Sequence, residues 1–316
     1  MMKKKIVKYL VFIGIFLVSS LVKAQQTPQY TNYMYNMSVM NPAYATDTPD
    51  VVNFGGFYRT QWVGAVGAPK TASLFAHVPL NEKIQMGLTF QNDDIGDVVS
   101  ENNINLNFAY ILPVSEKNYL SFGLSGGFNT YDVNFSGFQY TDPNFDPAFA
   151  NNINETFPSM GLGLFYYSDN YYLGLSTPNL LSKQTFEQQN GIYVEGIDAI
   201  HYYFTGGYVF DLKPNLKFKP AFMAKATEGA PISFDLTANV LINNLIEIGA
   251  AYRFDDSVSG LINFNVTPTL RIGYSYDYTL SNLGNYNSGS HEIFLLFNLD
   301  KSSLSSKGYE KSPRFF

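Results

Sequence analysis

In the stretch NINLNFAYIL, residues 103–112, asparagine stands at positions 103, 105 and 107, and large apolar side chains fill the alternate positions. Those apolar residues are Ile104, Leu106, Phe108, Tyr110 and Leu112. A period of two indicates a β-strand, because successive side chains leave a strand on opposite faces. In a soluble sandwich the apolar face would turn inward, whereas in an outer-membrane barrel it faces lipid and the polar face lines the lumen. One strand alone fits either arrangement.

The first 24 residues predict an exported protein. They contain lysines at positions 3, 4, 5 and 8, an apolar run over 9–21, and Val22 and Ala24 around a cleavage site. This order is typical of a secretory signal peptide. The apolar run is shorter than the roughly 20 residues of a spanning helix, so an N-terminal membrane anchor is the weaker alternative. We therefore expect the mature chain to begin at Gln25 and exclude residues 1–24 from the fold.

Composition narrows the class of protein further. Only 15% of the 316 residues are charged, while 16% are aromatic; ordinary soluble domains have about 25% charged residues. The expected signal peptide removes five of the 20 basic residues and none of the 26 acidic ones, which leaves a net charge of about −11. This charge argues against a nucleic-acid partner. The absence of cysteine from the sequence rules out disulfides and thiolate metal sites.

The same alternation recurs along the chain and predicts fourteen strands. We expect them near 51–60, 71–79, 84–92, 102–112, 118–129, 157–167, 171–177, 200–211, 215–226, 231–242, 245–254, 257–266, 268–279 and 289–299. Most have about the 9 to 11 residues that a tilted strand needs to cross a bilayer. The predicted fold is an all-β transmembrane barrel of about 14 antiparallel strands over residues 51–299. Residues 25–50 would form an N-terminal plug or periplasmic segment, and 300–316 a periplasmic tail.

The lengths of the predicted connections alternate. Even-numbered connections are short, as in PLNEK (79–83), whereas odd-numbered ones are longer on average, as in 61–70, 92–99, 130–156 and 178–199. Short periplasmic turns with longer external loops are typical of an outer-membrane barrel, which fixes the expected localisation. A secreted soluble all-β protein with an aromatic core is the alternative.

The inward-facing positions carry charges of both signs, and four of them are expected near the outer mouth. These residues are Arg59, Arg253, Asp277 and Glu292. Closure pairs the first strand with the last, so Arg59 and Glu292 should be neighbours within a charge network that braces the wall. The alternative is a set of separate solvated charges in a wet pore.

The segment TPQYTNYMYNMSVMNPAYA, residues 27–45, resembles the N-terminal signature of the PorP/SprF family of the type IX secretion system. The likeness continues through YRTQWVGAVGAPKTASLFAHVPL (58–80), YYLGLSTPNLL (171–181) and RIGYSYDYTLSNLG (271–284). The resemblance implies a non-enzymatic outer-membrane barrel that helps to secrete or anchor surface proteins with type B C-terminal sorting domains, including gliding adhesins. It also implies periplasmic or peptidoglycan-binding proteins of the secretion system as partners.

The N-terminal signature is expected to fold into or beneath the barrel as a plug. Tyr30, Tyr33, Tyr35, Asn41 and Pro42 are its candidate residues, because so many aromatic side chains would be poorly accommodated in a free tail. A disordered periplasmic leader is the competing expectation. The Asn41-Pro42-Ala43 element also resembles one in FadL-like transporters, so a FadL-like outer-membrane channel for small solutes is the alternative function.

The long external loops are the expected receptor surface for a secreted domain, because binding residues concentrate in loops on rigid scaffolds. The candidate contact residues are Phe135, Phe138, Tyr140, Asp142, Phe145, Asp146 and Phe149. The alternative is that these aromatic side chains pack the loop against the barrel of the same chain. No catalytic residue, metal site or cofactor is expected, since His77, His201 and His291 lack ligand spacing and the Asp and Asn residues of 139–155 do not match an EF-hand.

Overall fold

A computed structural model of the chain describes residues 28–46, 50–96, 98–135, 152–181, 184–189, 192–197, 200–227 and 230–300; within 184–189 and 192–197 it describes the strands but not the side chains. The expected signal peptide and the C-terminal tail lie outside these residues, apart from Asp300. No helix among the described residues is long and apolar enough to cross a bilayer.

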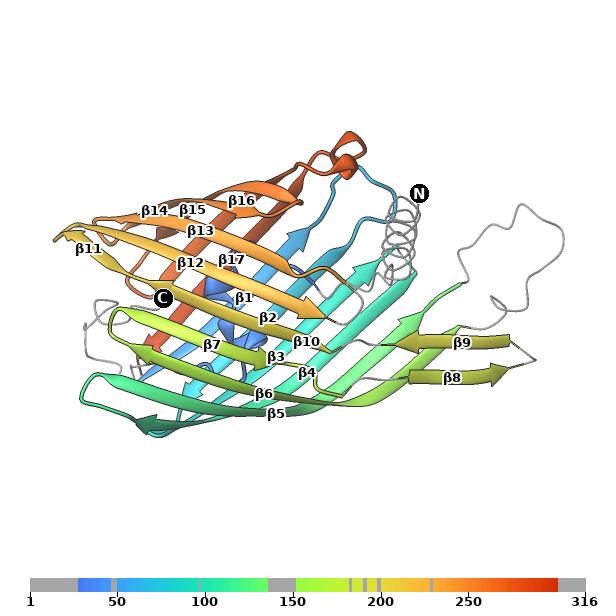
Figure 1. Cartoon of the computed structure of the whole chain (residues 1–316), viewed down its shortest axis with the longest axis horizontal. Helices are drawn as coiled ribbons and strands as arrows, with labels where there is room; N and C mark the ends of the chain where they lie inside the picture. The colour runs from blue at the N-terminus through green and yellow to red at the C-terminus, as the bar shows by residue number, and fades with distance from the viewer. Residues whose placement is uncertain are drawn as a thin grey trace, which may run out of the picture.

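The chain forms a closed antiparallel barrel (Figure 1). The main sheet has fifteen strands in the order β10-β7-β6-β5-β4-β3-β2-β1-β17-β16-β15-β14-β13-β12-β11, and an additional pairing of β10 with β12 closes it. Fourteen strands therefore form the wall and β11 is an extra one. The strands are β1 Val51–Thr60, β2 Lys70–Pro79, β3 Ile84–Ile95, β4 Val99–Pro113, β5 Asn118–Val133, β6 Ile153–Ser168, β7 Tyr171–Thr177, β8 Gln184–Gln189, β9 Ile192–Ile197, β10 His201–Tyr208, β11 Phe210–Lys213, β12 Leu216–Thr227, β13 Ser233–Ile242, β14 Ile246–Arg253, β15 Ser257–Asn265, β16 Leu270–Thr279 and β17 Ser290–Asp300.

The barrel has apolar side chains outside and polar side chains inside, as the alternation of 103–112 predicts for a membrane barrel. Ile104 and Leu106 of β4 are 50% and 57% exposed, whereas Asn105 and Asn107 are each 8% exposed. The soluble alternative would place the asparagines outside, so it is wrong. An outer surface of this kind suits lipid.

The expected strand 200–211 is interrupted. It divides at Val209 into β10 and β11, and the register of β11 against β12 shifts between Asp211 and Lys213. Val209 belongs to neither strand, and its N–H donates to the carbonyl oxygen of Asn170, at 2.8 Å. An irregularity of this kind bends a strand locally, which alternation of side chains does not reveal.

Strands β3 to β6 extend further than expected at the end of the long connections. The expected loop 92–99 is wrong, because β3 continues to Ile95, β4 begins at Val99, and Gly96 turns the chain with a φ of +70°. β5 continues to Val133 and β6 begins at Ile153, within the expected loop 130–156. The expected loop 178–199 contains β8 and β9, which pair only with each other. These extensions carry polar residues on both faces, so the apolar alternation that located the strands stops before they end.

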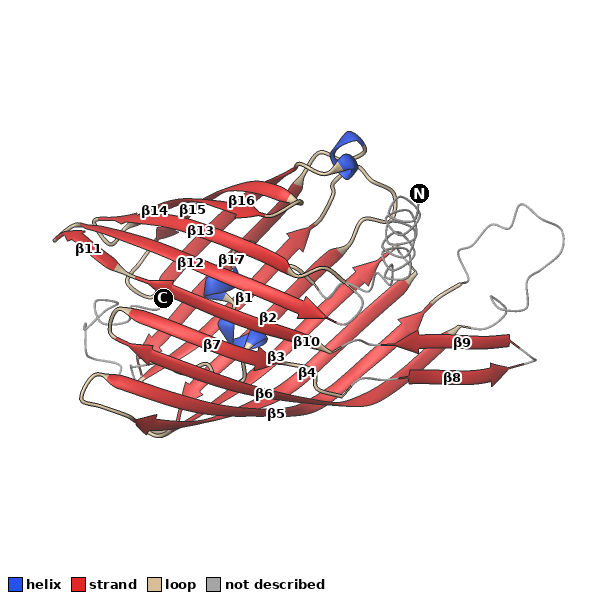
Figure 2. Cartoon of the chain, viewed as in Figure 1, coloured by secondary structure: helices blue, strands red, loops and turns tan. Residues whose placement is uncertain are grey.

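Residues 28–46, here called the inner segment, lie inside the barrel (Figure 2). The segment contains a 3-10 turn, η1 Tyr33–Tyr35, and a single helical turn, α2 Met37–Met40. Its side chains from Tyr30 to Thr46 are buried except for Val39, which is half-buried. A further 3-10 turn, η3 Asn282–Asn285, lies in the connection between β16 and β17. The inner segment is therefore the core of the molecule.

Candidate functional site in the barrel interior

Three charged residues of the wall meet near the end of the long connections. Arg59 of β1 is the register partner of Glu292 of β17, and its Nη1 lies 3.2 Å from Glu292 Oε2. Its Nη2 lies 2.6 Å from Oδ2 of Asp277 in β16. All three side chains are at most 3% exposed, so this cluster is buried. A buried charge cluster is stable only when every member is paired.

The two carboxylates of this cluster also hold the inner segment. The backbone N–H groups of Thr31 and Asn32 donate to Glu292, at 2.9 and 2.8 Å. The Thr31 hydroxyl donates to Asp277, at 2.8 Å. The inner segment thus satisfies acceptor positions that the guanidinium of Arg59 leaves open.

Arg253, the fourth residue of the expected network, lies in a neighbouring cluster. Its Nε and Nη2 donate to the carboxylate of Asp235, at 2.8 and 3.0 Å. Its Nη1 donates to Oε1 of Gln29, at 2.8 Å. The structure therefore brings Arg59, Asp277 and Glu292 into direct contact, while Arg253 reaches the inner segment separately.

A second charged cluster, near the short turns, surrounds Tyr35. The Tyr35 hydroxyl donates to Oε1 of Glu247, at 2.5 Å, and accepts from Nη1 of Arg271, at 3.0 Å. Lys219 Nζ lies 2.6 Å from the other oxygen of Glu247. Stacking of Tyr35 on Phe294, with centroids 4.9 Å apart, completes the contact. The sequence predicts charges of both signs inside the barrel, but it did not assign Lys219, Glu247 and Arg271 to a site; their inward alternation on β12, β14 and β16 was the available signal.

The Asn41-Pro42-Ala43 corner lies against three glycines of the wall. A Cβ on Gly123 would be 2.0 Å from the Ala43 nitrogen, and one on Gly163 would be 2.1 Å from Asn41 Oδ1. On Gly174 it would be 3.0 Å from Asn41 Nδ2. Sequence reasoning missed this cradle, although glycines at inward positions of three consecutive strands were a readable signal that a backbone approaches closely.

Polar bonds fix the rest of the inner segment to other strands. Asn107 Nδ2 donates to the carbonyl oxygen of Ser38, at 2.9 Å, and Ser176 Oγ donates to that of Met40, at 2.8 Å. Gln85 accepts from the Thr46 N–H and donates to the Thr46 carbonyl, at 2.8 and 2.7 Å. The segment therefore runs from Gln29, near the end of the long connections, to Thr46, near the short turns.

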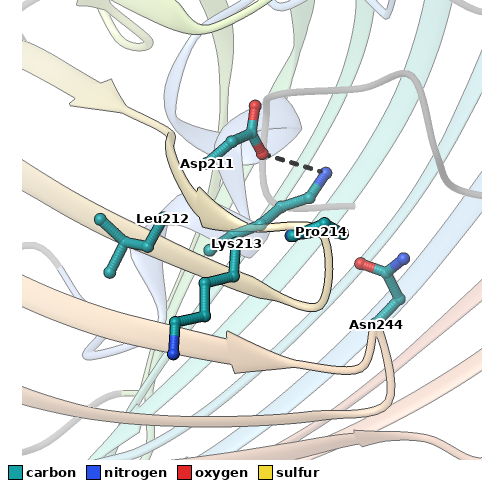
Figure 3. Close-up of a pocket in the computed structure, with 6 residues that line it drawn as sticks. Asp211, Leu212, Lys213, Pro214 and Asn244 are labelled. Carbon is teal, nitrogen blue, oxygen red and sulfur yellow. Dashed lines mark ion pairs between the residues drawn. The ribbon is translucent and has the colours of Figure 1, made fainter.

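A small cavity lies beside the inner segment. A cavity of about 90 Å³ lies between the inner segment, β3, β4 and Tyr203. A second, open concavity lies at the short turns and is bordered by the ion pair of Lys217 with Asp211, at 3.7 Å (Figure 3). Its other lining residues are Leu212, Lys213, Pro214 and Asn244.

The candidate loop residues fall at the limit of the described chain. The Phe135 N–H donates to Oδ1 of Asn152, at 2.9 Å. The other six, Phe138, Tyr140, Asp142, Phe145, Asp146 and Phe149, lie outside the described residues. Of the candidate residues of the N-terminal signature, Tyr30, Tyr33, Tyr35, Asn41 and Pro42 are all buried.

In the described part of the chain, no group of three or more His, Cys, Asp or Glu residues is placed to hold a metal ion. His77 Nε2 lies 2.6 Å from Gln85 Oε1, and His291 Nδ1 lies 2.6 Å from the Tyr274 hydroxyl. The arrangement as a whole is suited to retaining a polypeptide inside a barrel.

Comparison with known proteins gives a family and a fold. The family model described as "Type IX secretion system membrane protein PorP/SprF" matches residues 22–297. No curated protein matches the sequence. A Pseudomonas aeruginosa FadL homologue is 11% identical, with a TM-score of 0.46 over 79% of this chain and 89% of that one. The P. putida toluene transporter TodX is 10% identical, with a TM-score of 0.45 over 82% and 92%. Acinetobacter baumannii Omp33 is 11% identical, with a TM-score of 0.44 over 80% and 100%. These likenesses extend only to the barrel fold.

Proposed function

This chain belongs to the PorP/SprF family of type IX secretion system membrane proteins, and we propose that it is a plugged outer-membrane barrel that helps to secrete or anchor surface proteins with type B C-terminal domains. The observation that carries the proposal is the inner segment, which occupies the interior and bonds to the wall from β2 to β17. A barrel filled in this way is a rigid platform. It therefore contacts other proteins at its two ends.

The inner segment acts as the plug. Its bonds lie at both ends of the lumen: Thr31 and Asn32 are held by Glu292, and Tyr35 is held by Glu247. Release requires both carboxylates to lose these partners inside a closed wall, and unpaired buried charges are costly. FadL-like transporters also carry an N-terminal plug, so conductance, and not the plug itself, separates this proposal from a solute channel.

The partner-binding surface is the set of external loops, with the segment around Phe135 as its main part. Loops on a rigid scaffold commonly carry binding residues, and aromatic anchors dominate the energetics of protein interfaces. Phe138, Tyr140 and Phe145 are the proposed anchors, and Asp142 and Asp146 form the polar rim. Phe149 extends the apolar part of the surface. The cargo is a secreted protein with a type B C-terminal domain, and secretion-system proteins of the periplasm bind the short-turn end.

The test is retention of a type B cargo on native cells. Replacing Phe138, Tyr140 and Phe145 together with serine should release the cargo into the medium while the amount of barrel in the outer membrane stays normal. The matched control replaces three apolar residues of the other external connections, Val66, Leu283 and Tyr286, which are 106%, 48% and 76% exposed. Cargo that stays on cells with the first triple variant would refute the assignment of the loop.

Single-channel recordings address the alternative function. The purified barrel in a planar bilayer should show no steady ion current, and deletion of residues 28–46 should open a conducting pore. A wild-type barrel that conducts steadily, with a current that a small solute blocks, would favour a channel over a plugged platform.

A further inference from the structure

The barrel wall is incomplete beside the outer part of β6. β6 pairs with β5 along its whole length, from Ile153 opposite Val133 to Ser168 opposite Asn118. It pairs with β7 only between Leu162 and Tyr167, because β7 ends at Thr177. β8 and β9, the next strands in the chain, pair only with each other. Among the described residues, 153–159 of β6 therefore have a neighbouring strand on one side only, and we call their other side the open edge.

Two observations identify the backbone groups of the open edge. The carbonyl oxygen of Met160 accepts from Leu180 N–H, at 2.6 Å, on the side away from β5. Backbone groups alternate sides with a period of two, so those of Asn154, Thr156 and Pro158 point the same way. Pro158, which has no N–H, is consistent with this, since proline is tolerated at sheet edges. Asn154 and Thr156 thus present an N–H and a C=O each, and Pro158 presents a C=O, with no partner among the described residues.

Asn154 and Thr156 of the open edge lie beyond the lipid-facing belt. The outward positions are apolar up to Ile104, Phe128 and Pro158. Beyond them, the next two sets of outward register partners on β3 to β6 are polar. We call the ends of these four strands that carry them the leaf. Their outward residues are Asn92, Asn102, Thr130 and Thr156, followed by Asp94, Ser100, Asp132 and Asn154. Open sheet edges do not occur within the hydrocarbon of a bilayer, so an edge in the leaf has to meet water or another protein.

The leaf is acidic. Its described residues include Asp93, Asp94, Glu101, Asp132 and Glu155, and the segments 92–95, 99–102, 129–135 and 152–157 contain no lysine or arginine. An acidic strand edge repels a second copy of itself. It attracts a strand that has basic residues beside it.

We propose that the open edge of β6 receives a β-strand of a secreted protein that has lysine or arginine next to that strand. The added strand continues the sheet by main-chain hydrogen bonds to Asn154, Thr156 and Pro158, while Asp132 attracts the basic flanks. That the added strand belongs to a secreted cargo rests on the proposed function. That the open edge accepts a strand rests on the strand pairing of β6 and on the polar residues of the leaf.

Cross-linking in native cells tests the occupant. A photoreactive p-benzoylphenylalanine at Asn154, which is exposed, should form cross-links to a strand of an exported protein, and the cross-linked peptide should contain or adjoin lysine or arginine. Cross-links to residues 182–199 of the same chain, or to residues 153–161 of a second copy, would overturn the proposal.

A matched pair of variants tests the main-chain bonds. Thr156→Pro removes one N–H from the open edge without removing a bond to β5, and Thr156→Ala keeps that N–H. We expect cross-linking to the exported strand to fall on the order of 10-fold in T156P, about the effect of one hydrogen bond plus a steric block, and to stay near wild type in T156A. Asp132→Asn should lower it several-fold, an effect that added salt should mimic.

Two results separate the failure of this proposal from that of the proposed function. Equal cross-linking in T156P and T156A, with cargo still lost in the triple loop variant, would refute the edge and leave the cargo role intact. Normal cross-linking to an exported protein other than a type B cargo would keep the edge and refute the cargo assignment.

Discussion

Gly123 and Gly126 allow the same substitution to be compared in one strand. Both lie in β5 and neither has a positive φ, so alanine suits the backbone at each position. A Cβ on Gly126 would meet nothing within 4 Å, because this residue is on the outer surface. A Cβ on Gly123 would lie 2.0 Å from the nitrogen and 2.3 Å from the Cα of Ala43. Gly123→Ala should therefore push the inner segment away from the wall, and Gly126→Ala should not.

The size of the effect follows from the distances. Ordinary contacts of this kind begin at 3.4 Å, so the corner must withdraw by at least about 1.4 Å. Such a shift breaks the bond of Asn41 Nδ2 to the Leu164 carbonyl, now 3.1 Å long. Overpacking costs ~1–3 kcal/mol and a lost hydrogen bond about 0.5–1.5 kcal/mol. Release of the segment should become easier by about 1.5–4.5 kcal/mol, a factor of roughly 10 to 2,000 in the equilibrium.

A single cysteine reports on this release, because the sequence contains none. Ser38 is 2% exposed and its hydroxyl makes no hydrogen bond among the described residues, so Ser38→Cys should preserve the packing. Maleimide should label the cysteine slowly in the S38C parent, roughly 10 to 2,000 times faster with Gly123→Ala, and within about 3-fold of the parent with Gly126→Ala. Equal labelling rates in the two alanine variants would refute the reasoning that the glycine cradle holds the segment.

Three further changes probe the wall and its charges. Glu292→Gln should lower the free energy of unfolding by about 3–5 kcal/mol, because it leaves Arg59 short of a buried partner; urea unfolding in detergent would measure this against Glu82→Gln in an exposed turn. Leu106→Arg should cost about 2–4 kcal/mol if this residue lies near the bilayer midplane, and Asn105→Arg clearly less; equal losses in a lipid folding assay would contradict the assigned faces. Tyr35→Phe should destabilise the barrel by roughly 1.5–3 kcal/mol, since Glu247 loses a charged hydrogen bond; an unchanged urea midpoint would argue against it.

The faces of the strands could be predicted because they depend on local alternation. Each residue of 103–112 faces lipid or lumen according to its parity, and parity can be counted along the chain without knowledge of any partner strand. The neighbourhood of Arg59 and Glu292 was also predictable, since closure of a barrel joins the first strand to the last and their distances from the strand ends agree.

Other features were invisible because they depend on contacts between distant residues. Asp277 lies 218 positions from Arg59, and parity could not indicate that Arg253 would pair with Asp235 instead of joining that cluster. The close approach of Ala43 to Gly123 depends on where the inner segment bends. The outer ends of β3 to β6 were missed because polar residues on both faces interrupt the apolar alternation that marks a strand in lipid.

The sequence by itself thus determined the architecture: a cysteine-free chain of alternating strands whose apolar face meets lipid, since hydrophobic burial acts on each residue according to its own parity. Only the tertiary structure decided how the interior is filled. The course of the inner segment, its charged partners and the open edge of β6 all follow from closure of the barrel, which brings residues hundreds of positions apart within hydrogen-bonding distance.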